Sequence, residues 1–257
     1  MKSIEMQTED NKTIKKIPII AVCGKGGVGK TVFSALLSHV LVEKGVTPLL
    51  LVDADPVGGL TSAIGEKVTE TLSDVRDRFI GVARRGGQEE VEIAADQLDY
   101  FILKSLVERP KYSLLAMGHP QEKGCFCPAN ELLRSSIEVL VKAFAGVLID
   151  AEAGIEQINR DVTSHVNQVI VVVDGSQRSL GTLKMIKEMI KTAEVSVVLN
   201  RGTGPIDNEK LAGVKLLGVI PENEALRQFD REGKPLWQLP PENKALGSVR
   251  KIVARLI

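Results

Sequence analysis

Residues 17–31 read IPIIAVCGKGGVGKT, an apolar run followed at once by a glycine-rich loop that ends in Lys30 and Thr31. The loop matches the Walker A pattern GxxxxGK[ST] in the strand–loop–helix context that this pattern requires. Its glycines let backbone N–H groups curl around phosphate oxygens, and the following helix adds its positive N-terminal dipole. Lys30 is then expected to reach the β- and γ-phosphates and Thr31 to ligate Mg²⁺. The stretch predicts a phosphate-binding loop between a buried strand and a helix.

Further apolar runs of strand length follow along the chain, with helical patterns between them. The runs are nearly continuous instead of alternating, which is typical of parallel strands covered on both faces. They lie at 48–52, 113–117, 146–149, 168–173, 195–199 and 215–220. The helical patterns occupy 30–44, 129–144, 179–191 and 242–256. This alternation predicts an α/β fold with a doubly wound, mainly parallel sheet flanked by helices, as in P-loop NTPases.

The chain divides into a short polar start and one long region with this pattern. We expect residues 1–16 to form a flexible tail and residues 17–257 to form a single P-loop ATPase domain. The stretch 66–112 contains two charged helical segments around Arg84–Gln88, and the sequence gives it no evident role.

Charge and composition limit the classes of partner and the cellular location that we expect. The 33 basic and 33 acidic side chains cancel, so no overall positive field attracts a polyanion, and nucleic acid is not expected as a partner. The apolar runs are far shorter than the roughly 20 residues of a membrane span, which makes a membrane role unlikely on sequence grounds. The first 16 residues lack the apolar stretch of a secretory signal. Three cysteines, an odd number, do not make a disulfide framework, so we expect a cytoplasmic protein.

Acidic residues stand where two of the expected strands end. Asp55 follows the run at 48–52, and Asp150 follows the run at 146–149 in the Walker B type position, where it would hold Mg²⁺ through water. Phosphoryl transfer needs positioning and charge neutralisation more than covalent chemistry, so few groups suffice. The alternative is that both aspartates only cap strand ends. No NKxD guanine signature begins at Asn200, where the chain reads NRGT, so ATP is favoured over GTP.

A Cys-x-Cys motif precedes the helical pattern at 129–144. Residues 124–130 read GCFCPAN, and Pro128 suits the first position of a helix, which places Cys127 where the helix dipole stabilises a thiolate. Cys125 and Cys127 make half of a tetrahedral site, and a two-fold dimer would supply the other half. Zn²⁺, Ni²⁺ or an iron–sulfur cluster could all use four thiolates. Two buried structural cysteines, or a local disulfide, are the alternatives.

The lysine after the first glycine makes the loop a deviant Walker A motif, GKGGVGKT. With its surroundings it resembles the ATPase group that contains MinD, ParA and the nitrogenase iron protein. The resemblance implies a face-to-face homodimer with two ATP molecules at the seam, in which Lys25 reaches the nucleotide of the partner. It also implies that Asp55 lies in switch I and orients or deprotonates the attacking water, and that Asn200 reads the adenine edge. Val32 stands where many relatives have a second hydroxyl residue.

Taken together, motif and resemblance define the expected site, with ATP and Mg²⁺ as its ligands. The expected nucleotide-binding residues are Gly24, Lys25, Gly26, Gly27, Val28, Gly29, Lys30, Thr31, Val32 and Asn200. The expected catalytic residues are Lys25, Lys30, Asp55 and Asp150, and Thr31, Asp55 and Asp150 are the expected residues around Mg²⁺.

The combination of GKGGVGKT, DADP, GCFCPAN and DAEAGIE resembles the CooC-type ATPases, accessory proteins that mature the nickel centres of carbon monoxide dehydrogenase and acetyl-CoA synthase. The resemblance runs from about residue 17 to the end of the sequence. It implies an ATP-driven metallochaperone, a homodimer that holds Ni²⁺ or Zn²⁺ between Cys125 and Cys127 of both chains and serves a nickel enzyme.

Two other functions remain open. One is a MinD- or ParA-like positioning ATPase, best supported by the amphipathic segment 249–257, which a last helix packed on the sheet explains more economically. The other is an ATP-driven electron donor of the nitrogenase iron protein type, which requires an iron–sulfur cluster.

Overall fold

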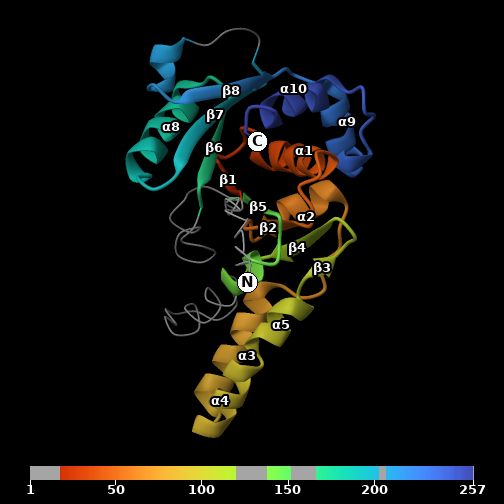
Figure 1. Ribbon diagram of the computed structural model, residues 1–257, viewed down its shortest axis with the longest axis vertical. Coiled ribbons are helices and arrows are strands. Elements are labelled where there is room, and N and C mark those ends of the chain that lie inside the picture. The colour runs from red at the N-terminus through yellow and green to blue at the C-terminus, as the bar shows by residue number, and fades with distance from the viewer. Residues whose placement is uncertain (1–17, 120–137, 152–165, 203–206, 257) are drawn as a thin grey trace, which may run out of the picture.

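A computed structural model describes residues 18–119, 138–151, 166–202 and 207–256. These residues contain one eight-stranded sheet with helices on both faces (Figure 1). Its strands are β1 (Ile19–Cys23), β2 (Leu49–Asp53), β3 (Val107–Glu108), β4 (Tyr112–Ala116), β5 (Gly146–Asp150), β6 (Gln168–Val173), β7 (Glu194–Asn200) and β8 (Lys215–Ile220). Their spatial order is β3-β4-β2-β5-β1-β6-β7-β8. Each pair of neighbours is parallel except β3 and β4, so the predicted fold class is confirmed.

The continuous apolar runs arise because the central strands are buried on both faces. In β1, Ile20 and Val22 belong to the hydrophobic cluster on one side of the sheet, and Ile19, Ala21 and Cys23 to the cluster on the other. All five side chains are buried. Successive side chains of the strand therefore point to opposite faces of the sheet. The sequence does not alternate between apolar and polar residues, because both faces meet an apolar layer.

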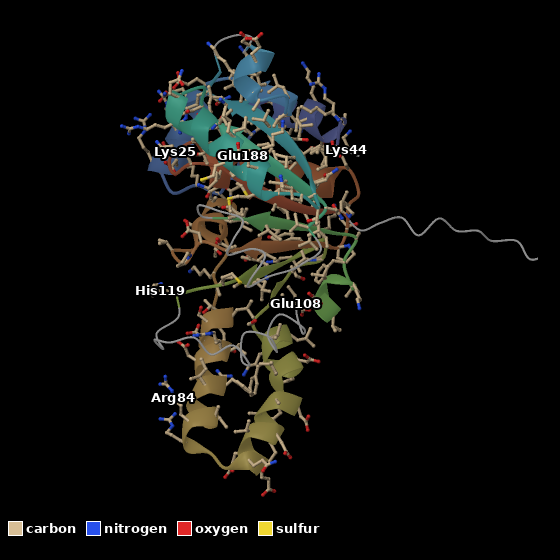
Figure 2. The ribbon with its side chains drawn as sticks, turned by 90° about the vertical axis from the view of Figure 1, so that its left-hand side faces the viewer. Lys25, Lys44, Arg84, Glu108, His119 and Glu188 are labelled. Carbon is tan, nitrogen blue, oxygen red and sulfur yellow. The ribbon has the colours of Figure 1, made fainter. Side chains whose placement is uncertain are left out.

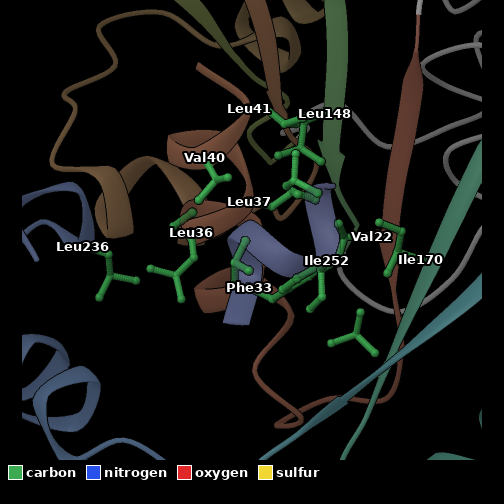
Figure 3. Packing of buried hydrophobic residues seen from close by; sticks show 14 of the residues in the cluster. Val22, Phe33, Leu36, Leu37, Val40, Leu41, Leu148, Ile170, Leu236 and Ile252 are labelled. Atoms are coloured by element: carbon green, nitrogen blue, oxygen red, sulfur yellow. The ribbon is translucent and has the colours of Figure 1, made fainter. Parts of the chain in front are cut away.

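One face of the sheet is covered by helices from both ends of the chain. They are α1 (Lys30–Glu43), α2 (Gly59–Ile64), α9 (Glu224–Arg231), the short 3₁₀ helix η2 (Leu236–Gln238) and α10 (Lys244–Val253). Phe33 and Leu37 of α1 and Ile252 of α10 lie in the same buried cluster, which Figure 3 shows at close range. The apolar face of the segment 249–257 thus packs on the sheet, with Val249 buried, as the more economical interpretation predicted.

The opposite face is covered by a second set of elements. They are α5 (Leu98–Lys104), α8 (Gln177–Met189), the 3₁₀ helix η1 (Asn208–Leu211) and the first turn of α3 (Leu72–Arg85). Residues 138–141 are the described helical part of the pattern predicted at 129–144, and Leu140 and Phe144 bury their side chains in this cluster.

A helical arm, defined here as α3 and α4 (Gln88–Asp96), projects beyond the β3–β4 edge of the sheet (Figure 1). The two charged helical segments predicted around Arg84–Gln88 are these helices, and Gly86 and Gly87 separate them. The arm has a small cluster of its own around Phe79 and Ile80, and α4 contains no buried residue. The outer part of the arm is therefore held by this small cluster, whereas the first turn of α3 is anchored by Leu72 and Val75 in the cluster on the sheet.

Several described elements were not predicted: the strand β3, the helices α2, α5 and α9, and the 3₁₀ helices η1 and η2. Among the described residues, no helix is both long enough and apolar enough to cross a membrane. The predicted tail, residues 1–16, lies outside the described residues, and the division into a tail and a single domain stays a prediction.

Candidate nucleotide-binding and hydrolysis site

The parallel strands end together at one edge of the sheet, where the loop after β1 also lies. In the register of the sheet, Val22 of β1 and Asp53 of β2 both pair with Asp150 of β5. The chain first adds β2, β4 and β5 on one side of β1 and then β6, β7 and β8 on the other. The loop therefore occupies the switch point of the sheet, where open α/β sheets bind ligands.

Close approaches on one side and open space on the other shape the phosphate loop. At Gly24, φ is +142° and a Cβ atom would lie 2.4 Å from the carbonyl oxygen of Val172. At Gly29, φ is +89° and a Cβ atom would lie 2.4 Å from Nδ2 of Asn200. Only glycine fits these two positions. On the outer side, a Cβ at exposed Gly26 or Gly27 would meet no atom within 4 Å, so their backbone is open to a ligand.

Helix α1 begins at Lys30, directly after the loop, and aims its first N–H groups at the open space. Nζ of Lys30 donates a hydrogen bond to the carbonyl oxygen of Lys25, at 3.3 Å, so the side chain folds back over the loop. Lys25 lies on the outer side of the same edge (Figure 2). Val28 is buried beneath the loop, and Val32 is half-buried against the cluster below α1. The structure thus brings the predicted phosphate-binding residues together.

Asp150 is buried at the end of β5 and is held by two hydroxyl groups of α1. Oγ1 of Thr31 donates to one carboxylate oxygen and Oγ of Ser34 to the other, each at 2.8 Å. Burial raises the pKa of the Asp150 carboxyl to about 6. The sequence predicted both Thr31 and Asp150 around Mg²⁺, and the structure places them in direct contact. Ser34 was missed, although its position three residues after Thr31 puts both hydroxyls on one face of the helix.

Asp55 lies in the loop between β2 and α2, next to Thr31. A Cβ on Gly59 would lie 3.5 Å from both Oδ2 of Asp55 and Oγ1 of Thr31. Oδ1 of Asp55 accepts a hydrogen bond from the N–H of Val57 at 2.9 Å, which curls the loop back on itself. Asp55, Thr31 and Asp150 are therefore neighbours at the open side of the phosphate loop.

Asp53, two residues earlier, was not singled out from the sequence. Its side chain is fully buried and accepts three hydrogen bonds, two from Thr61 and one from the N–H of Asp55. Burial raises the pKa of this carboxyl. The available signal was a carboxylate at the last position of a buried strand, where its charge needs partners.

Asn200 closes the site from the side of β7. Its Nδ2 donates to the carbonyl oxygen of Val28 at 2.7 Å, and its Oδ1 accepts from the N–H of Arg201 at 3.1 Å. The residue therefore supports the phosphate loop through Val28, a role that no local motif predicts. The predicted contact with adenine stays a prediction.

The hard oxygen donors at the loop fit a Mg²⁺ ion bound jointly with a nucleotide, since Mg²⁺ uses few protein ligands together with phosphates and water. Thr31 would ligate the ion directly and Asp150 through water. Cys125 and Cys127 lie outside the described residues. Within the described part of the chain, no group of three or more His, Cys, Asp or Glu residues is placed to hold a metal by itself. Cys23 is buried in the core, and burial raises the pKa of its thiol to about 12.

A parallel sheet with a Walker A loop at its switch point and an aspartate at the next strand end defines a P-loop ATPase. The chain belongs to the CobQ/CobB/MinD/ParA nucleotide binding domain family, whose model matches residues 19–236. Mg-ATP is the substrate that this class of site takes.

The relatives include both a carbon monoxide dehydrogenase accessory protein and a septum site-determining protein. The chain is 39% identical to the uncharacterized ATP-binding protein MJ0685 of Methanocaldococcus jannaschii, over 93% of this chain and 98% of that protein. It is 32% identical to the carbon monoxide dehydrogenase accessory protein CooC of Rhodospirillum rubrum, over 86% of this chain and 90% of that protein. Among solved structures, the septum site-determining protein MinD of Pyrococcus horikoshii, in complex with Mg-ADP, matches with a TM-score of 0.64 at 21% identity, over 93% of this chain and 96% of that one.

Proposed function

We propose that this ATPase works as a nucleotide-gated homodimer that handles Ni²⁺ or Zn²⁺ as cargo for a nickel enzyme. The observation that carries the metal role is the GCFCPAN motif, which lies in the sequence between β4 and β5 of a P-loop ATPase. The likeness to the accessory protein CooC, at 32% identity over most of both chains, supports the same role.

The hydrolysis step is assigned to residues of the described edge. The open backbone at Gly26 and Gly27 and the N-terminus of α1 bind the phosphates, and Lys30 reaches the β- and γ-phosphates once its bond to Lys25 opens. When bound, Mg²⁺ neutralises charge on the phosphates. Asp55 accepts a hydrogen bond from the attacking water and aligns it with the γ-phosphate. Most of the rate enhancement then comes from positioned charge.

The dimer is assigned to the same edge of the sheet. Lys25 lies at this edge (Figure 2), and its side chain forms no hydrogen bond or ion pair with the residues that the structure describes. In the face-to-face arrangement that the family likeness implies, Lys25 adds positive charge to the nucleotide of the partner. ATP would then tighten the dimer, because each nucleotide is bound by both chains.

The metal site is assigned to Cys125 and Cys127 of both chains. Strand β4 is parallel to β2, so the chain leaves it at the edge that carries the phosphate loop, and His119 lies on the same side as Lys25 in Figure 2. The Cys-x-Cys motif follows shortly in the sequence. Two thiolates from each chain complete a tetrahedral site, so one divalent ion per dimer is expected.

The experiment that tests this proposal is calorimetric titration of Ni²⁺ and Zn²⁺ into the anaerobic protein, with and without a non-hydrolysable ATP analogue. We expect one ion per dimer and a higher affinity with the analogue, since linkage makes the coupling reciprocal. The double variant Cys125→Ser/Cys127→Ser should lose the ion, while Cys23→Ala, at the core cysteine, should keep it. Equal metal affinity in the double variant would overturn the assignment.

A positioning ATPase of the MinD or ParA type is the second candidate, favoured by the matches to MinD structures. Its sequence support was the amphipathic segment 249–257, but α10 buries Val249 and Ile252 against the sheet, so this face is used within the fold. Sedimentation with anionic liposomes and ATP separates the two: binding that depends on ATP favours the positioning function. An anaerobic protein with a visible iron–sulfur absorption band would instead favour the electron-donor alternative.

A further inference from the structure

The loop between β2 and α2 is fastened at both ends to one carboxylate. Oδ1 of Asp53 accepts from the N–H of Asp55 at 3.3 Å, at the start of the loop. Oδ2 accepts from both the N–H and Oγ1 of Thr61, each at 2.7 Å, in the first turn of α2. The Asp53 side chain is completely buried. A single buried group therefore holds both ends of residues 55–61.

This fastening decides where Asp55 lies relative to the phosphate loop. The first residue of α2, Gly59, lies against α1, where a Cβ would lie 3.4 Å from Cγ2 of Thr31 and 3.5 Å from its Oγ1. The same Cβ would lie 3.5 Å from Oδ2 of Asp55. A Cβ at position 59 would therefore be in ordinary van der Waals contact with both Thr31 and Asp55, so the three residues lie side by side.

A purely structural role explains a buried carboxylate poorly. Removing a carboxylate from water is costly, so a residue that merely filled this space at the end of β2 would be expected to be apolar. What the carboxylate adds is direction, because its two oxygens fix two different N–H groups and one hydroxyl. The register of the sheet also places Asp53 opposite Asp150, the residue that accepts the Thr31 hydrogen bond. The two carboxylates therefore lie at the ends of neighbouring strands.

We propose that Asp53 is a positioning residue for ATP hydrolysis, which fixes the loop 55–61 through Thr61 and so holds Asp55 beside Thr31. The proposal rests on the assignment of Asp55 to the attacking water. Asp53 itself touches neither nucleotide nor water in this scheme. Its loss should lower kcat through misplacement of Asp55, while the nucleotide, which the phosphate loop holds, still binds.

The test compares Thr61→Val with Thr61→Ser and Asp53→Asn. Valine keeps the shape and the N–H of residue 61 but loses the hydroxyl donor, serine retains the donor, and asparagine places an NH₂ group where an acceptor is needed. We expect kcat to fall about tenfold in Thr61→Val and at least as much in Asp53→Asn, since one charge-assisted hydrogen bond of this kind is lost. Thr61→Ser should restore kcat, and the dissociation constant of a non-hydrolysable ATP analogue should change by less than about threefold in all three.

The double variant Asp53→Asn/Thr61→Val should be no slower than Asp53→Asn alone, because both changes break the same contact. The matched control is the pair Thr71→Val and Asp74→Asn in the arm, where the same two groups of a threonine bond one aspartate oxygen at 2.8 and 2.7 Å. These variants should leave kcat unchanged.

Wild-type kcat in Thr61→Val, or equal slowing by valine and serine, would overturn the proposal. If Asp53→Asn fails to fold, the Thr61 series still decides the question. A wild-type protein without turnover would instead defeat the hydrolysis assignment itself, which is a different outcome.

Discussion

Two threonine–aspartate pairs of nearly the same geometry lie in very different regions of the molecule. At the phosphate-loop edge, Thr61 donates from its N–H and Oγ1 to one oxygen of Asp53, at 2.7 Å each. In the arm, Thr71 does the same to Asp74, at 2.8 and 2.7 Å. The first pair is formed around a fully buried carboxylate and fastens a loop, whereas the second is exposed and caps a helix. The same local chemistry therefore has different consequences, and burial decides which.

The phosphate-loop edge and the arm as a whole also differ in burial. The phosphate-loop edge contains buried carboxylates, close backbone contacts and hydrogen bonds between residues more than 100 positions apart. In the arm, α4 buries nothing and side-chain hydrogen bonds such as that between Thr71 and Asp74 join residues close in sequence, although the N–H of Ser73 donates to the carbonyl oxygen of Met117 at 2.9 Å. Changes at the edge are expected to affect turnover or global stability strongly, and changes in the arm weakly. The four predictions below test this contrast, from the largest effect to the smallest.

Removal of the Lys30 side chain should have the largest effect. Lys30→Ala takes a positive charge away from the phosphates in a site where positioned charge supplies most of the rate, so kcat should fall by about a hundredfold or more. Steady-state phosphate release measures it. Lys104→Ala, at an exposed lysine that ends α5, is the control and should leave kcat unchanged. Wild-type turnover in Lys30→Ala would break the assignment of the site.

The next contrast concerns stability. Leu37 of α1 is fully buried in the cluster between this helix and the sheet, and Leu37→Ala should lower the free energy of unfolding by roughly 2–5 kcal/mol through lost contacts and a cavity. Ile93 of the arm is 50% exposed, and Ile93→Ala should cost less than about 0.5 kcal/mol. Urea denaturation followed by circular dichroism measures both. A large loss in Ile93→Ala would mean that the arm is coupled to the core more tightly than its contacts indicate.

The contrast also explains which features the sequence reveals. The central strands were found because burial on both faces makes their runs apolar, and the helices of the arm because Gly86 and Gly87 separate two charged patterns. Strand β3 was missed since its two residues, Val107 and Glu108, are too few to make a pattern. Local sequence patterns therefore predict the long helices and strands well and the shortest ones poorly.

The residues of the site also differ in how well a local pattern predicts them. The loop motif predicts Lys30 and Thr31 because the chemistry is contained in eight consecutive residues. The contact of Asn200 with Val28 spans 172 positions and leaves no local trace. The hydrogen bond from Thr61 to Asp53 crosses a turn whose course is known only once the loop is folded. Long-range polar contacts need the sheet order before they can be predicted. The assignments of Cys125 and Cys127 stay predictions.

The capping pair of the arm should give a smaller effect. Thr71→Val removes the side-chain acceptor for the N–H of Asp74 and should lower the free energy of unfolding by about 1 kcal/mol, with kcat unchanged. Thr61→Val should do the reverse, with a clear loss of kcat. If the two variants behaved alike in both measurements, burial would not be the deciding difference between the pairs.

The smallest effect is expected from His39 of α1, on the side of the helix that meets Trp237. The rings stack with centroids 5.4 Å apart, and Nδ1 is buried without a hydrogen-bond partner among the described residues. Burial lowers the pKa of His39, opposed by the charge of Glu43 and assisted by that of Arg250. The folded protein therefore favours the neutral ring, while the unfolded chain takes up a proton near pH 6.5. This contribution to stability is present above pH 6.5 and declines as the pH falls from 6.5 through the lowered pKa of the folded state.

His39→Phe keeps a ring against Trp237 and removes the titration. The raised pKa values of Asp53 and Asp150 act in the opposite direction, since a folded state that binds protons more readily gains stability as the pH falls. The informative quantity is therefore the difference in free energy of unfolding between variant and wild type, measured in urea between pH 5 and 7.5. Trp237 is the only tryptophan of the chain, so its fluorescence reports on this helix directly. We expect the difference to move in favour of His39→Phe as the pH falls below 6.5 and to stay constant above it. A difference that is constant over the whole range would show that the ring at position 39 titrates equally in the folded and unfolded states.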